Sequence, residues 1–240
     1  MSLRTKLIQS IIHINENIFF YPKLKNFYKS IINNDVCILD VGSNKGQSID
    51  FFLDINPGIK IIGFEPNKKL FNKISNKYKK LTNVHLKNVG VSNISGTLMF
   101  NENVLDETST FETLNFDSDY LKKKAKILGV KPHDIIHSSY EVPVISLNEI
   151  IDHETLTNNV FVKIDVEGHE FQCLQGLLKA SQLQKVKYIQ LENHNDDMYA
   201  TKVSFSDITK LLNDYGFVIA HKIKHGFGDF EEVIFCNKNN

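Results

Sequence analysis

Four titratable residues occupy six positions immediately after an apolar run in the second half of the chain. The run 160–164 reads as a buried strand, and the charged group that follows is Asp165, Glu167, His169 and Glu170. A carboxylate at the end of a buried strand is costly unless it has a partner. We therefore expect a functional role for Asp165, whereas Glu170 is equally well explained as a cap of the following helix.

A second candidate site lies in the segment ILDVGSNKGQS, where Gly42 and Gly46 would let a ligand approach the backbone closely. The spacing differs from the G-x-G-x-x-G of dinucleotide binders, and Asp40 would repel a pyrophosphate. S-adenosylmethionine (SAM) carries an ammonium and a sulfonium, which would tolerate that acid. Glu65 ends the next apolar run, where an acid accepts hydrogen bonds from ribose hydroxyls. Together these residues predict a SAM-type nucleotide site.

The elements that must position these residues alternate between apolar runs and amphipathic segments. We expect seven strands, at 36–42, 59–66, 83–93, 160–164, 186–193, 217–222 and 231–238. Runs that are apolar throughout indicate a mostly parallel α/β sheet with helices on both faces. The last strand should be antiparallel, because its link to the preceding strand is too short for a crossover helix. Ligands of such sheets bind at the carboxyl ends of the strands.

The domain organisation predicted is an N-terminal helical extension over 1–35, divided at Pro22, followed by one domain over 36–240. A short extra strand is expected at 96–100. Residues 101–140 are polar and loop-like, apart from one helix that Gly129 would close. We expect this insert to cover the acceptor pocket, because its aromatic and polar residues suit a saccharide.

Bulk composition excludes several classes. Lys plus Arg and Asp plus Glu both number 28, so a zero net charge argues against nucleic acid as a partner. Cys37, Cys173 and Cys236 are far apart, which indicates free thiols in a reducing cytoplasm. Neither a signal peptide nor a long apolar run is visible, so we expect a cytoplasmic protein without a membrane span.

Taken together, the motifs resemble the FkbM family of SAM-dependent methyltransferases over residues 36–238. DVGSNKGQS resembles its glycine motif, GFEPN its ribose-acid strand, NVGVSN its third strand, and VFVKIDVEGHEFQCLQG its strand followed by D-x-E-G-x-E. The resemblance implies a Rossmann-like class I methyltransferase fold with SAM as cofactor. It also implies O-methylation of a hydroxyl on a small-molecule or glycan acceptor, namely a saccharide, glycolipid or natural product.

The resemblance further implies roles for individual residues. Gly42, Asn44 and Gly46 would line the methionine part of SAM, and Glu65 would bind the ribose. Asn88 and Val89 would flank the adenine, and Asp165 would face the reaction centre. The complete set of candidate cofactor-binding residues is Asp40, Gly42, Asn44, Gly46, Ser48, Glu65, Asn88, Val89 and Asp165.

Methylation of a hydroxyl requires positioning of the acceptor and removal of its proton. His169 and His194 lie at predicted strand ends and are candidate bases. Alternatively, Asp165, Glu192 and Asn193 would hold Mg²⁺ or Mn²⁺, in a pattern similar to the metal-dependent catechol-type O-methyltransferases.

Two other classes of function remain open from the sequence. Asp117 and Asp119 form a D-x-D pattern of the kind that holds a metal and a nucleotide sugar in glycosyltransferases, although Asp117 or Ser118 also suits a helix N-cap. A non-catalytic module would bind SAM without transferring its methyl group. A nucleic-acid base methyltransferase is disfavoured, because IDVEG stands where an N-P-P-Y-like tetrad would be expected.

Overall fold

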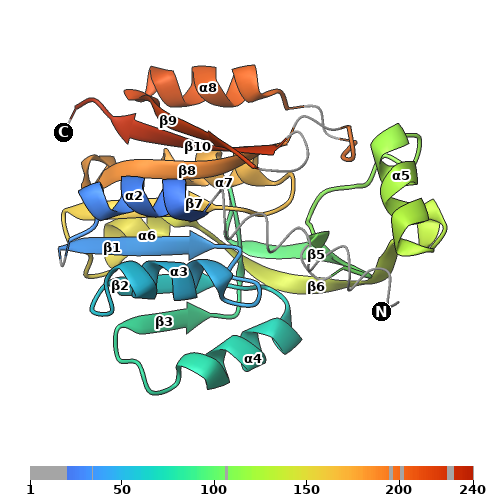
Figure 1. The fold of residues 1–240 in the computed structure, drawn as a ribbon, viewed down its shortest axis with the longest axis horizontal. Coiled ribbons are helices and arrows are strands. Elements are labelled where there is room, and N and C mark those ends of the chain that lie inside the picture. The colour runs from blue at the N-terminus through green and yellow to red at the C-terminus, as the bar shows by residue number, and fades with distance from the viewer. Residues whose placement is uncertain are drawn as a thin grey trace.

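The computed structural model describes residues 21–33, 35–105, 108–194, 197–200, 203–225 and 230–239. Its centre is a seven-stranded sheet with the order β3-β2-β1-β7-β8-β10-β9 (Figure 1). The strands are β1 Val36–Val41, β2 Lys60–Phe64, β3 Val84–Lys87, β7 Asn159–Ile164, β8 Val186–His194, β9 Phe217–Lys224 and β10 Phe230–Asn237.

The direction of the strands confirms the predicted topology. Strands β3, β2, β1, β7 and β8 pair in parallel, whereas β10 is antiparallel to both β8 and β9. The order reverses on either side of β1, which is where ligands bind in sheets of this type. The fold is therefore the Rossmann-like α/β class that the sequence predicts.

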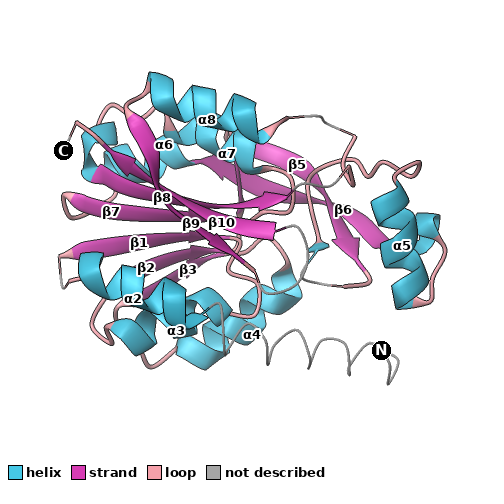
Figure 2. Ribbon diagram, turned by 45° about the horizontal axis from the view of Figure 1, so that its top comes forward, coloured by secondary structure: helices cyan, strands magenta, loops and turns pink. Residues whose placement is uncertain are grey.

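Helices cover both faces of the sheet (Figure 2). One face carries α2 Tyr21–Ile31, α3 Gln47–Ile55 and α4 Lys68–Tyr78, and the other carries α6 Leu147–His153, α7 Glu170–Leu177 and α8 Phe205–Asp214. Successive strand residues point to opposite faces, so Ile38 packs with the first set of helices and Leu39 with the second. Burial on both faces explains why the strands are apolar throughout.

A second, three-stranded sheet, in the order β4-β6-β5, was not predicted. Its strands are β4 Gly90–Ser92, β5 Gly96–Asn103 and β6 Ile136–Ser146. The expected continuous strand 83–93 is divided between the two sheets, and part of the expected loop 101–140 belongs to β5 and β6. Side chains of β6 are largely exposed or half-buried on both sides before Val142, so this strand lacks the apolar run that marks the others.

The predicted helix inside the insert is confirmed as α5, Asp119–Leu128. The Ser118 hydroxyl accepts the Leu121 backbone N–H at 3.0 Å, and Gly129 ends the helix in a left-handed conformation with φ of 75°. The insert lies beyond the carboxyl ends of the central strands (Figure 1). It is therefore placed beside the edge of the sheet where a ligand is expected.

Of the predicted N-terminal extension, the structure describes α2, which has Pro22 in its first turn, where proline is well tolerated. The helix expected before Pro22 lies outside the described residues. Tyr28 of α2 is fully buried against Phe52 and Phe161, so α2 packs into the core of the sheet. No helix in the described ranges has both the length and the apolar character needed to cross a bilayer.

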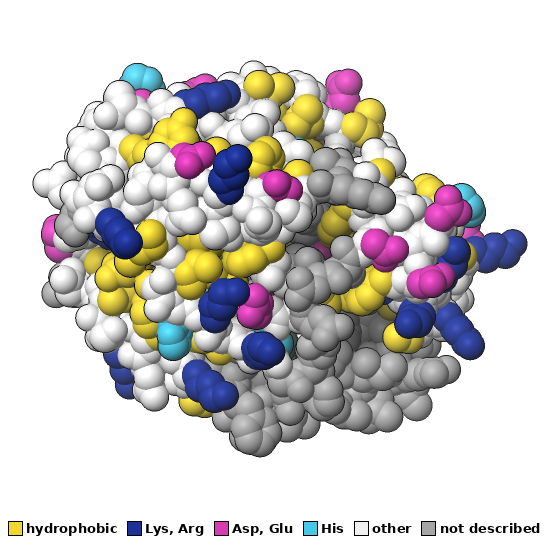
Figure 3. All heavy atoms as spheres, turned by 90° about the horizontal axis from the view of Figure 1, so that it is seen from above, with side chains coloured by type: hydrophobic (Ala, Val, Ile, Leu, Met, Phe, Trp, Pro, Cys, Tyr) yellow, Lys and Arg dark blue, Asp and Glu magenta, His cyan; other side chains and the backbone are white. Residues whose placement is uncertain are grey.

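Surface charges are mixed rather than segregated on the face seen in Figure 3, where lysine and acidic side chains are interspersed. This matches the equal numbers of basic and acidic residues in the chain. That face therefore presents no extended patch of one sign.

Candidate active site

A cleft opens where β1, β2 and β7 end. Its walls include the predicted site residues Gly42, Asn44, Glu65, Val89 and Asp165, together with Ser109 and Phe111 of the insert. The two charged segments singled out in the sequence, which are more than 100 positions apart, thus meet in one hollow.

The glycine motif forms the floor of this cleft through an unusually close approach of two strand ends. Gly42 has φ of +87°, and a Cβ placed there would lie 1.9 Å from the backbone oxygen of Asp165. Asn44, with φ of +45°, also lines the cleft. Gly46 has a different purpose, because a Cβ there would meet the Tyr78 hydroxyl at 2.4 Å. Gly46 therefore lets α4 pack against the loop rather than lining the cleft.

Glu65 joins the ends of β1 and β2. Its buried carboxylate accepts the backbone N–H of Asn44 and the backbone N–H of Asn67, each at 2.7 Å. Each carboxylate oxygen has a second lone pair, so the group stays able to accept further hydrogen bonds. Asn88 donates its amide to the Glu65 and Pro66 carbonyls and so holds this turn, while its neighbour Val89 lines the cleft.

Asp40 and Ser48 lie below the glycine loop rather than in the cleft. Asp40 is fully buried, and its Oδ2 accepts the Ser48 hydroxyl at 2.8 Å. Its Oδ1 has no hydrogen-bond partner among the described residues. Asp40 is aligned with Lys163 on the neighbouring strand β7. Burial by itself would lower the pKa of Lys163, but the charges of Asp165 and Asp40 outweigh it and hold that pKa above its ordinary value.

Asp165 is the first residue beyond β7 and has the partner that its position requires. Lys163 Nζ donates to Asp165 Oδ2 at 2.9 Å, and the Asp165 side chain is 35% exposed towards the cleft that it lines. The lysine side chain, only 12% exposed, supplies a fixed positive charge behind the acid. The lysine thus compensates the negative charge of the acid at the mouth of the sheet.

His169 is buried and has both ring nitrogens engaged. Nδ1 lies 2.6 Å from Oε1 of Glu112, and Nε2 lies 2.9 Å from the Ser92 hydroxyl. The ring thereby ties the insert to β4 at the start of α7, and this arrangement favours a positioning role over a general base. His194, the other predicted base, ends β8, but its side chain lies outside the described part.

Glu170 serves as a cap of the turn that precedes α7. Its Oε1 accepts the backbone N–H groups of Val166 and Gly168, both at 3.2 Å. This turn includes Glu167, which has φ of +54° and whose Oε2 accepts the Tyr199 hydroxyl at 2.9 Å. The capping interpretation of Glu170 is thus the one that the structure supports.

The residues predicted to hold a metal are only partly brought together. Carboxylate oxygens of Asp165 and Glu192 lie within 4.8 Å of each other, and Glu167 completes the group. Asn193 instead donates its amide to Glu231 at 3.1 Å. The sequence did not single out Glu167 as a ligand, and the turn geometry that brings it there is set by Gly168, whose φ is +95°.

The D-x-D pair lies outside the residues that line the cleft. Asp119 is in the first turn of α5, its side chain is 90% exposed, and it lies 4.0 Å from Lys122. Lys122 also donates to the backbone oxygen of Asp117. The pattern is explained by the start of a helix, with Ser118 as its N-cap.

Comparison with known proteins gives one family and one fold. Residues 40–219 match the Methyltransferase FkbM domain. The hexuronic acid methyltransferase AglP of Haloferax volcanii is 26% identical over 197 residues, which cover 78% of this chain and 71% of that protein.

Solved structures superpose on this chain over most of its length. The magnesium protoporphyrin IX methyltransferase ChlM from Synechocystis PCC 6803, solved with bound SAM, superposes with a TM-score of 0.50 and 13% identity over 98% of this chain and 83% of that one. TrmK of M. capricolum, solved with S-adenosylhomocysteine, superposes with a TM-score of 0.49 and 12% identity. The superposition covers 89% of this chain and 67% of that one.

Proposed function

The chain belongs to the FkbM family of SAM-dependent methyltransferases, and from this premise we propose that it methylates a hydroxyl oxygen of a hexuronic acid or a related saccharide. The observation that carries the proposal is that the glycine loop, Glu65 and Asp165 line the same cleft. The similarity to a hexuronic acid methyltransferase supports the acceptor class.

We place the cofactor along the wall formed by β1 and β2. Gly42, Asn44 and Gly46 shape the loop that takes the methionine part, and Glu65 accepts hydrogen bonds from the ribose hydroxyls. Val89 packs against the adenine, and Asn88 holds the turn behind it. The absence of a side chain at Gly42 and the fixed carboxylate of Glu65 suit this ligand. Bound SAM supplies an electrophilic methyl group.

Asp165 is the residue that we place at the acceptor end. Its ionised carboxylate accepts a hydrogen bond from the acceptor hydroxyl and orients the oxygen for in-line attack. The same carboxylate takes the hydroxyl proton as the oxygen bonds to the methyl carbon of SAM, whose bond to sulfur breaks so that S-adenosylhomocysteine leaves. Lys163, at 2.9 Å, compensates the negative charge of this carboxylate. His194 stays a second candidate base, and His169 has the positioning role that its two hydrogen bonds support.

A divalent cation is the alternative route for the proton. The oxygen-rich group Asp165, Glu167 and Glu192 supports Mg²⁺ or Mn²⁺, which would acidify the hydroxyl and orient it. Loss of turnover in EDTA and recovery with Mg²⁺ or Mn²⁺ would favour the cation, whereas full turnover in EDTA would leave Asp165 or His194 as the base.

We also propose a cytoplasmic location. All three cysteines are free, and Cys37 and Cys173 are buried. Buried free thiols are typical of proteins in a reducing compartment.

The deciding experiment supplies labelled SAM together with a glucuronic acid oligosaccharide. The control acceptor is the same oligosaccharide after reduction of the uronic acid to glucose. We expect label in the uronic acid sugar as an ether that survives mild alkali. An alkali-labile methyl ester would show that the carboxylate is the acceptor and would overturn the hydroxyl assignment. Binding of SAM without transfer to any saccharide would instead support the non-catalytic module.

A further inference from the structure

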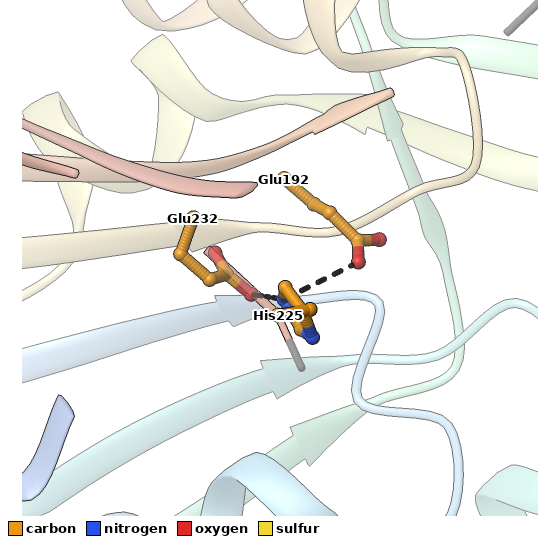
Figure 4. A group of neighbouring side chains, drawn as sticks. All are labelled: Glu192, His225 and Glu232. Atoms are coloured by element: carbon orange, nitrogen blue, oxygen red, sulfur yellow. Dashed lines mark ion pairs between the residues drawn. The ribbon is translucent and has the colours of Figure 1, made fainter. Parts of the chain in front are cut away.

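Three polar side chains converge at the edge of the sheet where β8 and β9 end and β10 begins (Figure 4). They are Glu192 near the end of β8, His225 just after β9, and Glu232 near the start of β10. His225 Nε2 lies 3.7 Å from Oε1 of Glu192 and 3.7 Å from Oε1 of Glu232. One ligand atom from each residue lies within 4.8 Å of the other two.

The two acids in this group are direct neighbours across the sheet. Glu192 pairs with Glu232 in the antiparallel register of β8 and β10, so both side chains project from the same face. Their side chains are only 17% and 9% exposed. Like charges directly opposite each other destabilise a sheet, so a cation held between the two carboxylates would offset their repulsion.

Lys163 and Lys222 make their direct contacts with other acids, although the charge of Lys163 also acts on Glu232. Lys163 donates to Asp165 at 2.9 Å, and Lys222 donates to Glu231 at 3.1 Å. His225 faces both acids at a distance beyond a normal hydrogen bond. The two 3.7 Å separations are close to the spacing of about 3.4 Å between two ligands of a tetrahedral ion with bonds of about 2.1 Å.

Gln190 provides a separate observation that points to a ligand. It lies two residues before Glu192 on β8, on the same face, and is 1% exposed. Its amide donates to Oε2 of Glu232 at 2.7 Å, while its own Oε1 has no hydrogen-bond partner among the described residues. A buried amide oxygen on a side chain that already contacts the Glu232 carboxylate is an acceptor suited to a cation or to water bound to that cation.

We propose that Glu192, His225 and Glu232 bind a divalent transition-metal ion such as Mn²⁺ or Zn²⁺. One imidazole with two carboxylates suits these ions, whereas Mg²⁺ favours oxygen ligands alone. Gln190 fixes the orientation of Glu232, as outer hydrogen bonds do in metal centres. Glu192 also lies within 4.8 Å of Asp165 in the cleft, so the ion would stand beside the acceptor end. Only this last point rests on the proposed function.

The test uses the full chain after removal of metal, with Co²⁺ and Mn²⁺ as probes. We expect one equivalent of Co²⁺ to bind with a visible absorption spectrum of nitrogen and oxygen ligation, and Mn²⁺ to lose its free-ion EPR signal. His225→Gln and Glu232→Gln should each weaken binding at least tenfold, and His225→Gln should change the Co²⁺ spectrum. Glu231→Gln, on the same strand, is the matched control and should bind as the wild type does.

Two results would overturn the site. One is a failure of the wild-type protein to bind Co²⁺ or Mn²⁺ at millimolar concentrations of the metal. The other is binding that survives His225→Gln but is lost in Asp165→Asn and Glu167→Gln, which would move the ion to the oxygen-only group. Calorimetry with S-adenosylhomocysteine on the same samples shows whether the protein is folded and binds the product of the cofactor. Loss of metal binding with normal S-adenosylhomocysteine binding is a failure of the metal site alone, whereas loss of S-adenosylhomocysteine binding by the wild type is a failure of the proposed function.

Discussion

Gly42 lies directly against the backbone oxygen of Asp165, at a distance that leaves no room for a side chain at position 42. The glycine loop after β1 and the acidic turn after β7 are therefore interlocked rather than merely adjacent. In the function that we propose, this contact aligns the part of the cleft that takes SAM with the acid that faces the acceptor.

Replacing Gly42 with alanine should damage both stability and cofactor binding. The added methyl group would lie 1.9 Å from the Asp165 oxygen, and the φ of +87° disfavours a residue with a Cβ. We expect a loss of at least about 1 kcal/mol in the free energy of unfolding and at least tenfold weaker binding of S-adenosylhomocysteine. Urea unfolding and calorimetry measure the two effects.

The matched control for this substitution is Gly58→Ala, because a Cβ at Gly58 meets only the Asn56 side chain, at 3.6 Å. This variant should bind S-adenosylhomocysteine as the wild type does. A Gly42→Ala protein with unchanged unfolding and unchanged affinity would contradict the close approach.

Glu65→Gln tests the acid assigned to the ribose. The amide would place a donor against one of the two backbone N–H groups that the carboxylate now accepts, and it would offer the ribose one acceptor fewer. Hydrogen bonds to charged groups contribute about 1.5–3 kcal/mol, so the dissociation constant for S-adenosylhomocysteine should rise about 10- to 150-fold. The control is Glu154→Gln. Glu154 pairs with Lys87 and does not line the cleft, so this variant should leave the dissociation constant for S-adenosylhomocysteine unchanged.

His169 and Glu112 offer a test that separates positioning from base catalysis. His169→Ala would leave the buried Glu112 carboxylate without the imidazole that binds it, and we expect a loss of about 1–3 kcal/mol in unfolding free energy. His169→Asn, which keeps a donor, should recover part of that stability.

The pH profile of methyl transfer in the His169 variants decides between the two roles. A positioning residue predicts that transfer by the folded variants keeps the wild-type pH profile. Normal stability combined with a loss of at least 100-fold in kcat and an altered pH profile would identify His169 as the base.

The parts of the fold that were predicted correctly are those with a signal inside a short window of sequence. Strands such as β1 and β7 are buried on both faces, so every residue from Val36 to Val41 is apolar except Asp40. Helix α5 was placed by Ser118 and Gly129 because caps are local features. Strand β6 was missed because only its last residues are buried, and Pro143 interrupts them.

The parts of the site that were missed depend on contacts between distant segments. Glu112 lies 57 positions from His169 and meets it only because the insert folds back onto β4. His225 and Glu232 reach Glu192 because β10 is inserted between β8 and β9. The charged residues themselves were visible in the sequence, but a strand order of this kind decides which of them become neighbours.

The buried thiol of Cys37 predicts a loss of stability at alkaline pH. Burial raises the pKa of Cys37 from its ordinary value of 9.0 to about 11. Between these values the unfolded chain releases the thiol proton while the folded protein keeps it, so the stability present below pH 9 is lost as the pH rises towards 11. The shift corresponds to about 2–3 kcal/mol.

Urea unfolding at several pH values should show the stability advantage of the wild type over Cys37→Ala shrinking by about this amount between pH 9 and pH 11. Val162→Ala, a non-titratable truncation in the neighbouring strand β7, should differ from the wild type by a constant amount. A pH-independent difference for Cys37→Ala would show that the thiol is not buried as the fold requires.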